Sequence, residues 1–126
     1  MSEQLRGVVV SHGALASALV DAVGRITGET DALVPVSNDG CSRELLLEQL
    51  ATAVGAQPAV VFVDLPSGSC LQASAAYLRT HDEVAVVVGV NLAMLIDFVY
   101  HREASPADAA QRAIATGERA MRVWGP

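Results

Sequence analysis

The sequence has no lysine and few aromatic residues. Its eight basic residues are all arginine, fourteen acidic residues bring the net charge to −6, and aromatic side chains make up only 4% of the chain. Without a basic run or rings on which bases can stack, the composition argues against nucleic acid as a partner. The lack of lysine also excludes the G-x-x-x-x-G-K-[ST] loop of nucleoside triphosphatases, and the dinucleotide fingerprint G-x-G-x-x-G is missing as well.

Long apolar runs are missing too. Each apolar stretch is broken by a charge, a glycine or a proline well before the roughly 20 residues that a membrane span requires. The start of the chain lacks the basic segment and the apolar stretch of a secretory signal. We therefore expect a cytoplasmic protein in which the two cysteines, Cys41 and Cys70, are free thiols.

What the chain does have is a large supply of aliphatic residues. Apolar residues make up 52% of its 126 positions, which suits one domain, over residues 1–126, with a parallel sheet covered by helices. Strands are predicted at residues 8–11, 32–36, 59–64 and 83–88. Helices are predicted at residues 15–26, residues 44–54 with Ser42 as the cap, after Ser69 to about Arg79, residues 93–100 with Asn91 as the cap, and from Pro106 to near Gly117.

Alternating strands and helices at this spacing predict an α/β fold with a doubly wound, mainly parallel sheet. Pro35 has no N–H to donate to a neighbouring strand, so the second strand is placed at an edge and the order 2-1-3-4 is favoured over 1-2-3-4. In that order a crevice opens between the ends of the first and third strands, which are followed by His12 and Asp64. Residues 121–124 are either a last short strand or the fraying end of the last helix.

His12 and Asp64 are the candidate catalytic residues. A histidine that carries a phosphoryl group needs one ring nitrogen free to attack, the other held by an acceptor, and donors around the arriving oxygens. Asp64 is a suitable acceptor for the proton on the non-attacking nitrogen. Ser67, Gly68 and Ser69, at the start of a helix, offer hydroxyls, backbone N–H groups and the positive end of a helix dipole to the phosphate.

Each of these residues also has a purely structural explanation. A histidine before a glycine at a strand end is typical of a turn into a helix, and an aspartate there is often a capping residue. The meeting of His12 and Asp64 at one predicted crevice favours the functional interpretation. His81 is predicted to be a solvated loop residue, and His101 is predicted to interact with the carbonyl end of a helix. Neither has metal-ligand spacing to a cysteine, and Cys70 is predicted to be a small buried thiol, so we expect no metal site.

Three segments carry a resemblance to a known family. They are Gly7-Val8-Val9-Val10-Ser11-His12-Gly13, Val63-Asp64-Leu65-Pro66-Ser67-Gly68-Ser69-Cys70 and Gly89-Val90-Asn91-Leu92-Ala93-Met94-Leu95. In this order and spacing they resemble the mannose-type enzyme IIA family of the bacterial sugar phosphotransferase system, from Gly7 to about Val123. The loop after Asp64 departs from the pattern, because it reads Leu-Pro-Ser-Gly-Ser-Cys where the best-known members have Gly-Gly-Ser-Pro.

The resemblance implies a phosphorylated histidine. By it, His12 takes a phosphoryl group from the phosphocarrier HPr and passes it to an enzyme IIB, Asp64 orients His12, and Ser69 with the neighbouring amides holds the phosphate. It also implies a homodimer in which residues 121–124 form an antiparallel strand that is exchanged or packed between subunits, and membrane contact only through the transporter complex. We expect no cofactor.

Other functions fit the same fold. One is a free-standing module that senses phosphorylation and regulates a partner, and another is the phosphotransfer subunit of dihydroxyacetone kinase. In that subunit the histidine segment is usually Ser-His-Ser, whereas this chain has Ser11-His12-Gly13. Flavodoxin-like cofactor binding is disfavoured because the loops lack aromatic residues that would enclose a flavin.

Overall fold

A single parallel sheet organises the chain. The computed structural model describes residues 4–125. The strands are β1 (Arg6–Ser11), β2 (Leu33–Ser37), β3 (Ala59–Val63) and β4 (Val84–Val88). The helices are α1 (Leu15–Thr27), α2 (Arg43–Val54), α3 (Ser69–Leu78), α4 (Leu92–Tyr100) and α5 (Pro106–Ala120). All three strand pairs are parallel and the order is β2-β1-β3-β4, so the predicted α/β fold and strand order are confirmed.

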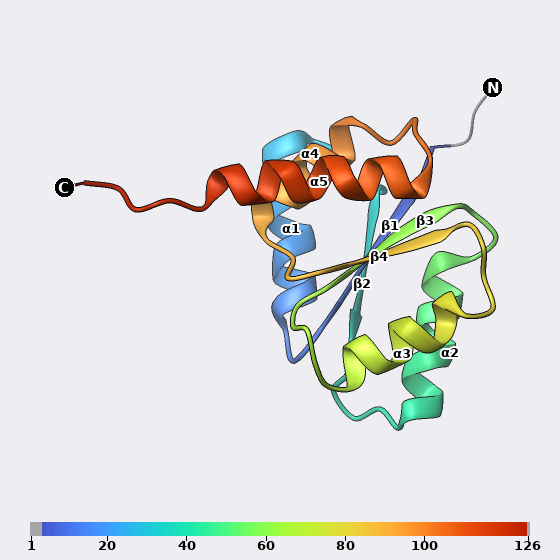
Figure 1. The fold of residues 1–126 in the computed structure, drawn as a ribbon. Helices are drawn as coiled ribbons and strands as arrows, with labels where there is room; N and C mark the ends of the chain where they lie inside the picture. Colours follow the sequence, from blue (N-terminus) through green and yellow to red (C-terminus); the bar gives the residue numbers. More distant parts are fainter. Residues whose placement is uncertain (1–3, 126) are drawn as a thin grey trace.

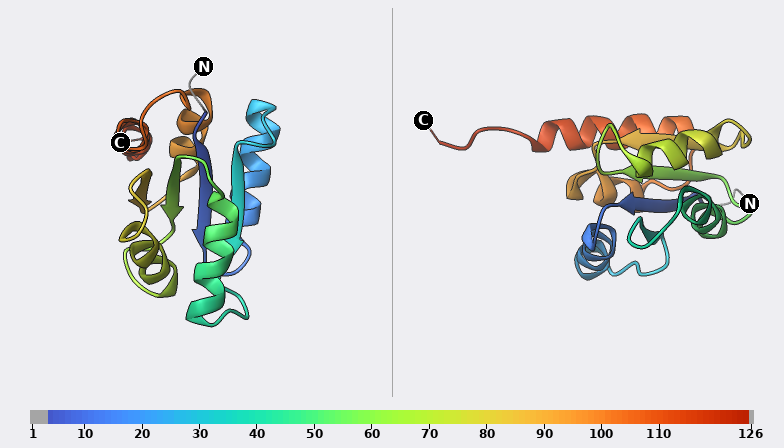
Figure 2. Two further views of the ribbon diagram at one scale, coloured as in Figure 1. Left: turned by 90° about the vertical axis from the view of Figure 1, so that its right-hand side faces the viewer. Right: turned by 90° about the horizontal axis from the view of Figure 1, so that it is seen from below.

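Helices cover both faces of this sheet (Figures 1 and 2). Alternate residues of β1 face opposite sides: Val9 packs into a core with residues of α1, α4 and α5, whereas Val8 and Val10 pack into a second core with α2 and α3. All three valines are fully buried. Because both faces of the central strands are covered, β3 is apolar throughout and β1 is apolar at its three central valines.

The edge position of β2 follows from Pro35. This residue is opposite Val9 of β1, and β2 has a strand neighbour on that side only. The predicted helix caps are confirmed as well, because the Ser42 side chain accepts from the Leu45 N–H and the Asn91 side chain accepts from the Met94 N–H.

The last helix is longer than predicted. The helix was predicted to end near Gly117, and it continues through this glycine to Ala120. The glycine serves packing instead: a Cβ atom there would lie 2.8 Å from Met94 Cε and 3.2 Å from Asn91 Nδ2, and the Asn91 amide donates to the Gly117 carbonyl. Its lack of a side chain lets α5 approach α4 closely.

Residues 121–125 form neither the strand nor the helix end that the sequence suggested. They leave the body of the molecule beyond α5 without regular structure (Figures 1 and 2). Val123 and Trp124 are 88% and 91% exposed. Nothing within residues 4–125 of one copy therefore covers these two apolar side chains.

None of the helices in residues 4–125 combines the length and the apolar character that a membrane crossing requires.

Candidate functional site

The carboxyl ends of β1 and β3 bring His12 and Asp64 together. Val10 is opposite Val63 in the parallel register, so the chain leaves both strands at the same edge of the sheet. His12 Nδ1 lies 2.8 Å from Asp64 Oδ2, and the backbone N–H of His12 donates to the same oxygen over 2.9 Å. One carboxylate oxygen thus fixes both the main chain and the ring of His12.

This contact determines which ring nitrogen is available for chemistry. An ionised carboxylate only accepts hydrogen bonds, so Nδ1 of His12 carries the proton and the lone pair of the neutral ring resides on Nε2. Within residues 4–125 no hydrogen bond occupies Nε2. The His12 side chain is 41% exposed whereas that of Asp64 is 8% exposed. The ring is therefore accessible to solvent, and the carboxylate that holds it is buried.

Hydrogen bonding to Asp64 favours its ionised form. Burial by itself raises the pKa of this carboxyl group, but the hydrogen bonds from the His12 backbone and ring, attraction to the ring when it is charged, and the Leu65 N–H bond together lower the pKa below its ordinary value of 3.8. Asp64 is therefore an anion at neutral pH, as a partner for Nδ1–H must be.

The turn that carries His12 is held at several points. Ser11 is fully buried, and its hydroxyl accepts from the Ala16 N–H in the first turn of α1 over 2.6 Å. Gly13 has a φ of +60°, a left-handed conformation that favours glycine, and the Ser37 hydroxyl donates to its carbonyl over 2.8 Å. The helix-entry role that the sequence allowed for this turn and the pairing of His12 with Asp64 are thus both realised.

The loop after β3 faces the free nitrogen. Gly68 has a φ of +91°, and a Cβ atom on it would lie 3.4 Å from His12 Nε2. Helix α3 begins at the next residue, Ser69, so its N-terminal amides and its positive dipole end are next to Nε2. Ser67 is exposed in the same loop, and within residues 4–125 no hydrogen bond joins it to the His12 ring.

Two residues that the sequence analysis did not assign to the site lie beside it. The Asn38 amide, from the loop after β2, donates to Ser69 Oγ over 3.2 Å. Cys70 Sγ lies 3.9 Å from His12 Nδ1, and burial, followed by the charge of Asp64, raises the pKa of its thiol. Their positions in the sequence could have indicated both residues, because each follows a strand whose carboxyl end lies at the same end of the sheet as His12.

The other two histidines have structural roles away from this site, as predicted. His81 is an exposed loop residue whose ring stacks on Tyr77 with centroids 3.8 Å apart. Arg112 donates to His101 Nε2 over 2.9 Å, so Nδ1 of this neutral ring carries the proton and donates to the Asp97 carbonyl over 2.8 Å.

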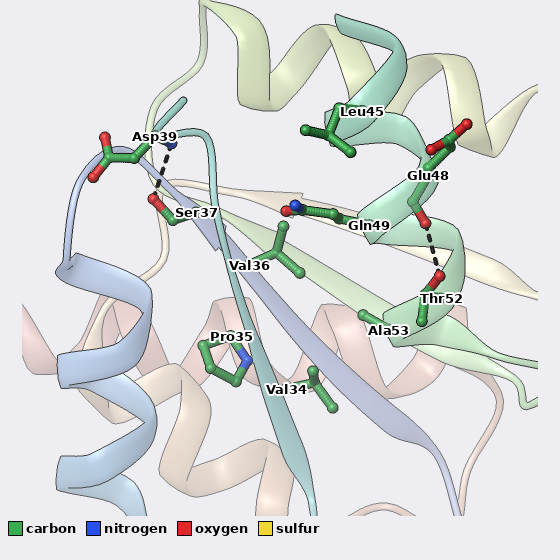
Figure 3. A pocket seen from close by; sticks show the side chains of 10 residues that line it. All are labelled: Val34, Pro35, Val36, Ser37, Asp39, Leu45, Glu48, Gln49, Thr52 and Ala53. Atoms are coloured by element: carbon green, nitrogen blue, oxygen red, sulfur yellow. Dashed lines mark hydrogen bonds between the residues drawn. The ribbon is translucent and has the colours of Figure 1, made fainter. Parts of the chain in front are cut away.

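The His12 ring is accessible from solvent, with 41% of its side chain exposed. A groove of about 520 Å³ runs between β2 and α2, where Pro35, Leu45 and Gln49 are among the lining residues (Figure 3). His12 and Asp64 do not line this groove. A histidine exposed in this way suits a group delivered by another macromolecule better than an enclosed small substrate.

The fold and the site define a class of protein: a doubly wound α/β protein with an ionised aspartate behind an exposed histidine at the switch point of its sheet. Comparison with known proteins gives the particular family. Residues 7–115 match the model of the EIIA-man family, described as the fructose IIA component of the phosphotransferase system (PTS). The chain belongs to this family and is a IIA phosphocarrier component of a sugar PTS.

The chain is also similar to a curated relative and, in its fold, to solved structures. The chain is 29% identical to the sorbose-specific EIIA component of Klebsiella pneumoniae over 95% of its own length and 92% of the relative's. The crystal structure of component EIIA from Streptococcus agalactiae has a TM-score of 0.87 at 21% identity, covering 94% of this chain and 96% of that one. The mannose/sorbose-specific IIA subunit of Enterococcus faecalis has a TM-score of 0.86 at 22% identity, covering 98% and 97%.

Replacing Asp64 with asparagine is expected to weaken the dependence of stability on acidic pH. The pKa of Asp64 in the folded chain lies below its ordinary value of 3.8. The carboxylate therefore stabilises the fold above that pH, and this contribution is lost as the pH falls through the lowered folded-state pKa. Urea denaturation from neutral pH to well below 3.8 should show a smaller loss of unfolding free energy in Asp64→Asn than in the native chain. Asp31→Asn, at an exposed position, should lose as much unfolding free energy over this pH range as the native chain does. An equal loss of unfolding free energy on acidification in all three proteins would contradict the lowered pKa of Asp64.

Proposed function

We propose that Nε2 of His12 accepts a phosphoryl group from HPr and passes it to an enzyme IIB in the cytoplasm. The observation that carries this proposal is the 2.8 Å contact between His12 Nδ1 and Asp64 Oδ2, with Nε2 free and next to the N-terminus of α3. The contact keeps the proton on Nδ1 and so keeps the lone pair on the nitrogen that faces the anion-binding helix end.

The phosphoryl transfer needs no group other than the donor and the His12 ring. The Nε2 lone pair forms the bond to phosphorus, and the bond from phosphorus to the donor breaks with its electron pair remaining on the donor. Since Nδ1 keeps its proton, the phosphorylated ring is cationic, and the Asp64 carboxylate stabilises that charge. Transfer to the acceptor reverses these steps and returns the neutral ring.

The phosphoryl oxygens are held at the start of α3 in this proposal. The first amides of a helix have no intrahelical partners and carry a partial positive charge. Gly68 leaves room for the phosphoryl group because it has no side chain, and the Ser69 hydroxyl is fixed by Asn38. Ser67 is exposed in the same loop and supplies a further hydroxyl once the phosphate is bound.

The surroundings of His12 suit contact with protein partners. Leu15 and Leu65, each within three residues of a member of the His12–Asp64 pair, are 45% and 50% exposed. Apolar side chains around a reactive group are typical of the centre of a protein interface. HPr and enzyme IIB would in turn cover this surface while the phosphoryl group moves.

Phosphorylation of His12 can be tested directly. The chain, incubated with phosphoenolpyruvate, enzyme I and HPr, is expected to form an acid-labile, alkali-stable adduct on His12. His12→Ala should form none, whereas His81→Ala should be phosphorylated like the native chain because His81 lies in an exposed loop away from the site. Equal phosphorylation of His12→Ala would show that another residue is the acceptor.

Gly68 provides a test of the attacking nitrogen. Gly68→Ala places a methyl group 3.4 Å from Nε2 and should slow phosphorylation about ten- to a hundredfold, since small displacements of a reacting group are costly. Gly40→Ala introduces an alanine at a similar φ of +68° with no atom within 4 Å of its Cβ, and it controls for backbone strain. If both variants react at the native rate, access to Nε2 does not limit transfer.

We also propose that two copies of the chain form a homodimer through residues 121–124. Met121, Val123 and Trp124 are 65%, 88% and 91% exposed, and β4 is an edge strand with a neighbour only in β3. An exposed apolar segment and an unpaired strand edge are each stabilised when a strand from a second copy pairs at that edge.

Sedimentation velocity tests this dimer. The native chain is expected to sediment as a dimer. Trp124→Asp should weaken association at least about tenfold, because it places a charge in a segment that the proposed dimer buries. Ile26→Asp, which adds the same charge at a position on α1 that is 56% exposed, should leave the dimer intact. A monomeric native chain would refute this arrangement.

A further inference from the structure

Three potential metal ligands meet behind the exposed edge of the His12 ring. His12, Asp64 and Cys70 each present one ligand atom, and these three atoms all lie within 4.8 Å of one another. We propose that they form a binding site for a thiophilic divalent cation, with Zn²⁺ as the best match. The spacing of His81 and His101 from the cysteines predicted no metal site, but the three ligands come together at His12 instead.

The spacing of the ligand atoms is close to what zinc requires. Nδ1 of His12 lies 2.8 Å from Asp64 Oδ2 and 3.9 Å from Cys70 Sγ. Bonds of roughly 2.0–2.3 Å in tetrahedral geometry place ligand atoms about 3.3–3.8 Å apart. The third pair, Asp64 Oδ2 and Cys70 Sγ, lies within 4.8 Å, so side-chain movements of up to about one ångström bring all three ligands onto one ion. The mixture of one nitrogen, one oxygen and one sulfur ligand favours Zn²⁺ over Mg²⁺ and Ca²⁺, which prefer oxygen alone.

The ligands are supported by the fold. Cys70 is fully buried in the first turn of α3, where it packs into the core beneath α2 and α3. Asp64 is held by the Leu65 N–H over 3.0 Å. The His12 side chain is 41% exposed, so the proposed ion would lie close to the surface, and a zinc site with three protein ligands takes water as the fourth.

Proton and charge balance are satisfied. The Cys70 thiol loses its proton to solvent and binds as a thiolate, and the proton on Nδ1 of His12 moves to Nε2 as Nδ1 binds the metal. The thiolate and the Asp64 carboxylate contribute two negative charges, which neutralise the dication. No oxidant, reductant or further reactant is needed.

Metal binding and phosphorylation would exclude each other, a consequence that rests on the proposed function. Once Nδ1 is bound to the metal, the neutral ring carries its proton on Nε2 and has no lone pair there for attack. Asp64 is also withdrawn from its support of the ring. The site would then act as an inhibitory metal site in which Zn²⁺ blocks entry of the phosphoryl group.

The binding test uses the full chain and Zn²⁺ alone. Isothermal titration should show one ion per chain, and Cys70→Ser and Cys70→Ala should each bind at least about tenfold more weakly, since each lacks a ligand. Two variants are used because serine places a hydroxyl in the core and alanine leaves a small void, and circular dichroism checks that each is folded. Cys41→Ser, which removes the other free thiol, should bind like the native chain.

Two outcomes would overturn the metal site: no binding of Zn²⁺ by the folded native chain, or native affinity in both Cys70 variants. Cobalt substitution gives an independent measurement, because Co²⁺ bound to a thiolate has a charge-transfer absorption in the near ultraviolet. That band should appear in the native chain and in Cys41→Ser but be lost in Cys70→Ser.

A second experiment separates this proposal from the proposed function. With phosphorylated HPr as the donor, Zn²⁺ should slow phosphoryl transfer to the native chain at least about tenfold. In Cys70→Ser the transfer rates with and without Zn²⁺ should be nearly equal. A chain that binds Zn²⁺ but is never phosphorylated refutes the phosphocarrier chemistry of His12 and leaves the metal site in place. A chain that is phosphorylated at the same rate with saturating Zn²⁺ refutes the inhibitory site alone.

Discussion

The double hydrogen bond between His12 and one oxygen of Asp64 is the interaction on which the whole site depends. The backbone N–H donates over 2.9 Å and Nδ1 lies 2.8 Å away, so the ring and its own main chain share one acceptor. The Asp64 side chain is only 8% exposed, and its other oxygen accepts a third hydrogen bond from the Leu65 N–H. The carboxylate therefore has little freedom to move. Its fixed position determines the tautomer of the ring, the direction of Nε2 and the charge behind it.

This interaction exists because of how the sheet is wound. Helix α1 leaves β1 towards the same face as α4 and α5, whereas α3 leaves β3 towards the face that α2 covers. The two chain segments therefore separate at the carboxyl ends of adjacent strands, with His12 on one and Asp64 on the other. The same separation exposes the ring and places the N-terminus of α3 beside it, where an anion is stabilised.

Much of this arrangement was predictable from local patterns. Pro35 indicated the edge strand, continuous apolar segments indicated buried strands, and together they indicated the order β2-β1-β3-β4 and the meeting of His12 with Asp64. The end of the last helix was mispredicted because Gly117 is a packing residue against Met94, and a sequence does not distinguish that role from a helix stop. Residues 121–125 were ambiguous because their apolar side chains stay largely exposed among the described residues, so packing imposes no regular structure on them.

The sequence by itself determined the layers, the strand order and the identity of the two central residues, because periodicity and backbone chemistry act over short distances along the chain. Only the tertiary structure decided that Nδ1 and not Nε2 faces Asp64, that Asn38 fixes Ser69, and that Cys70 lies 3.9 Å from the histidine. These contacts join residues 31 to 58 positions apart in the chain. Their distances depend on how each loop leaves its strand, which no local pattern specifies.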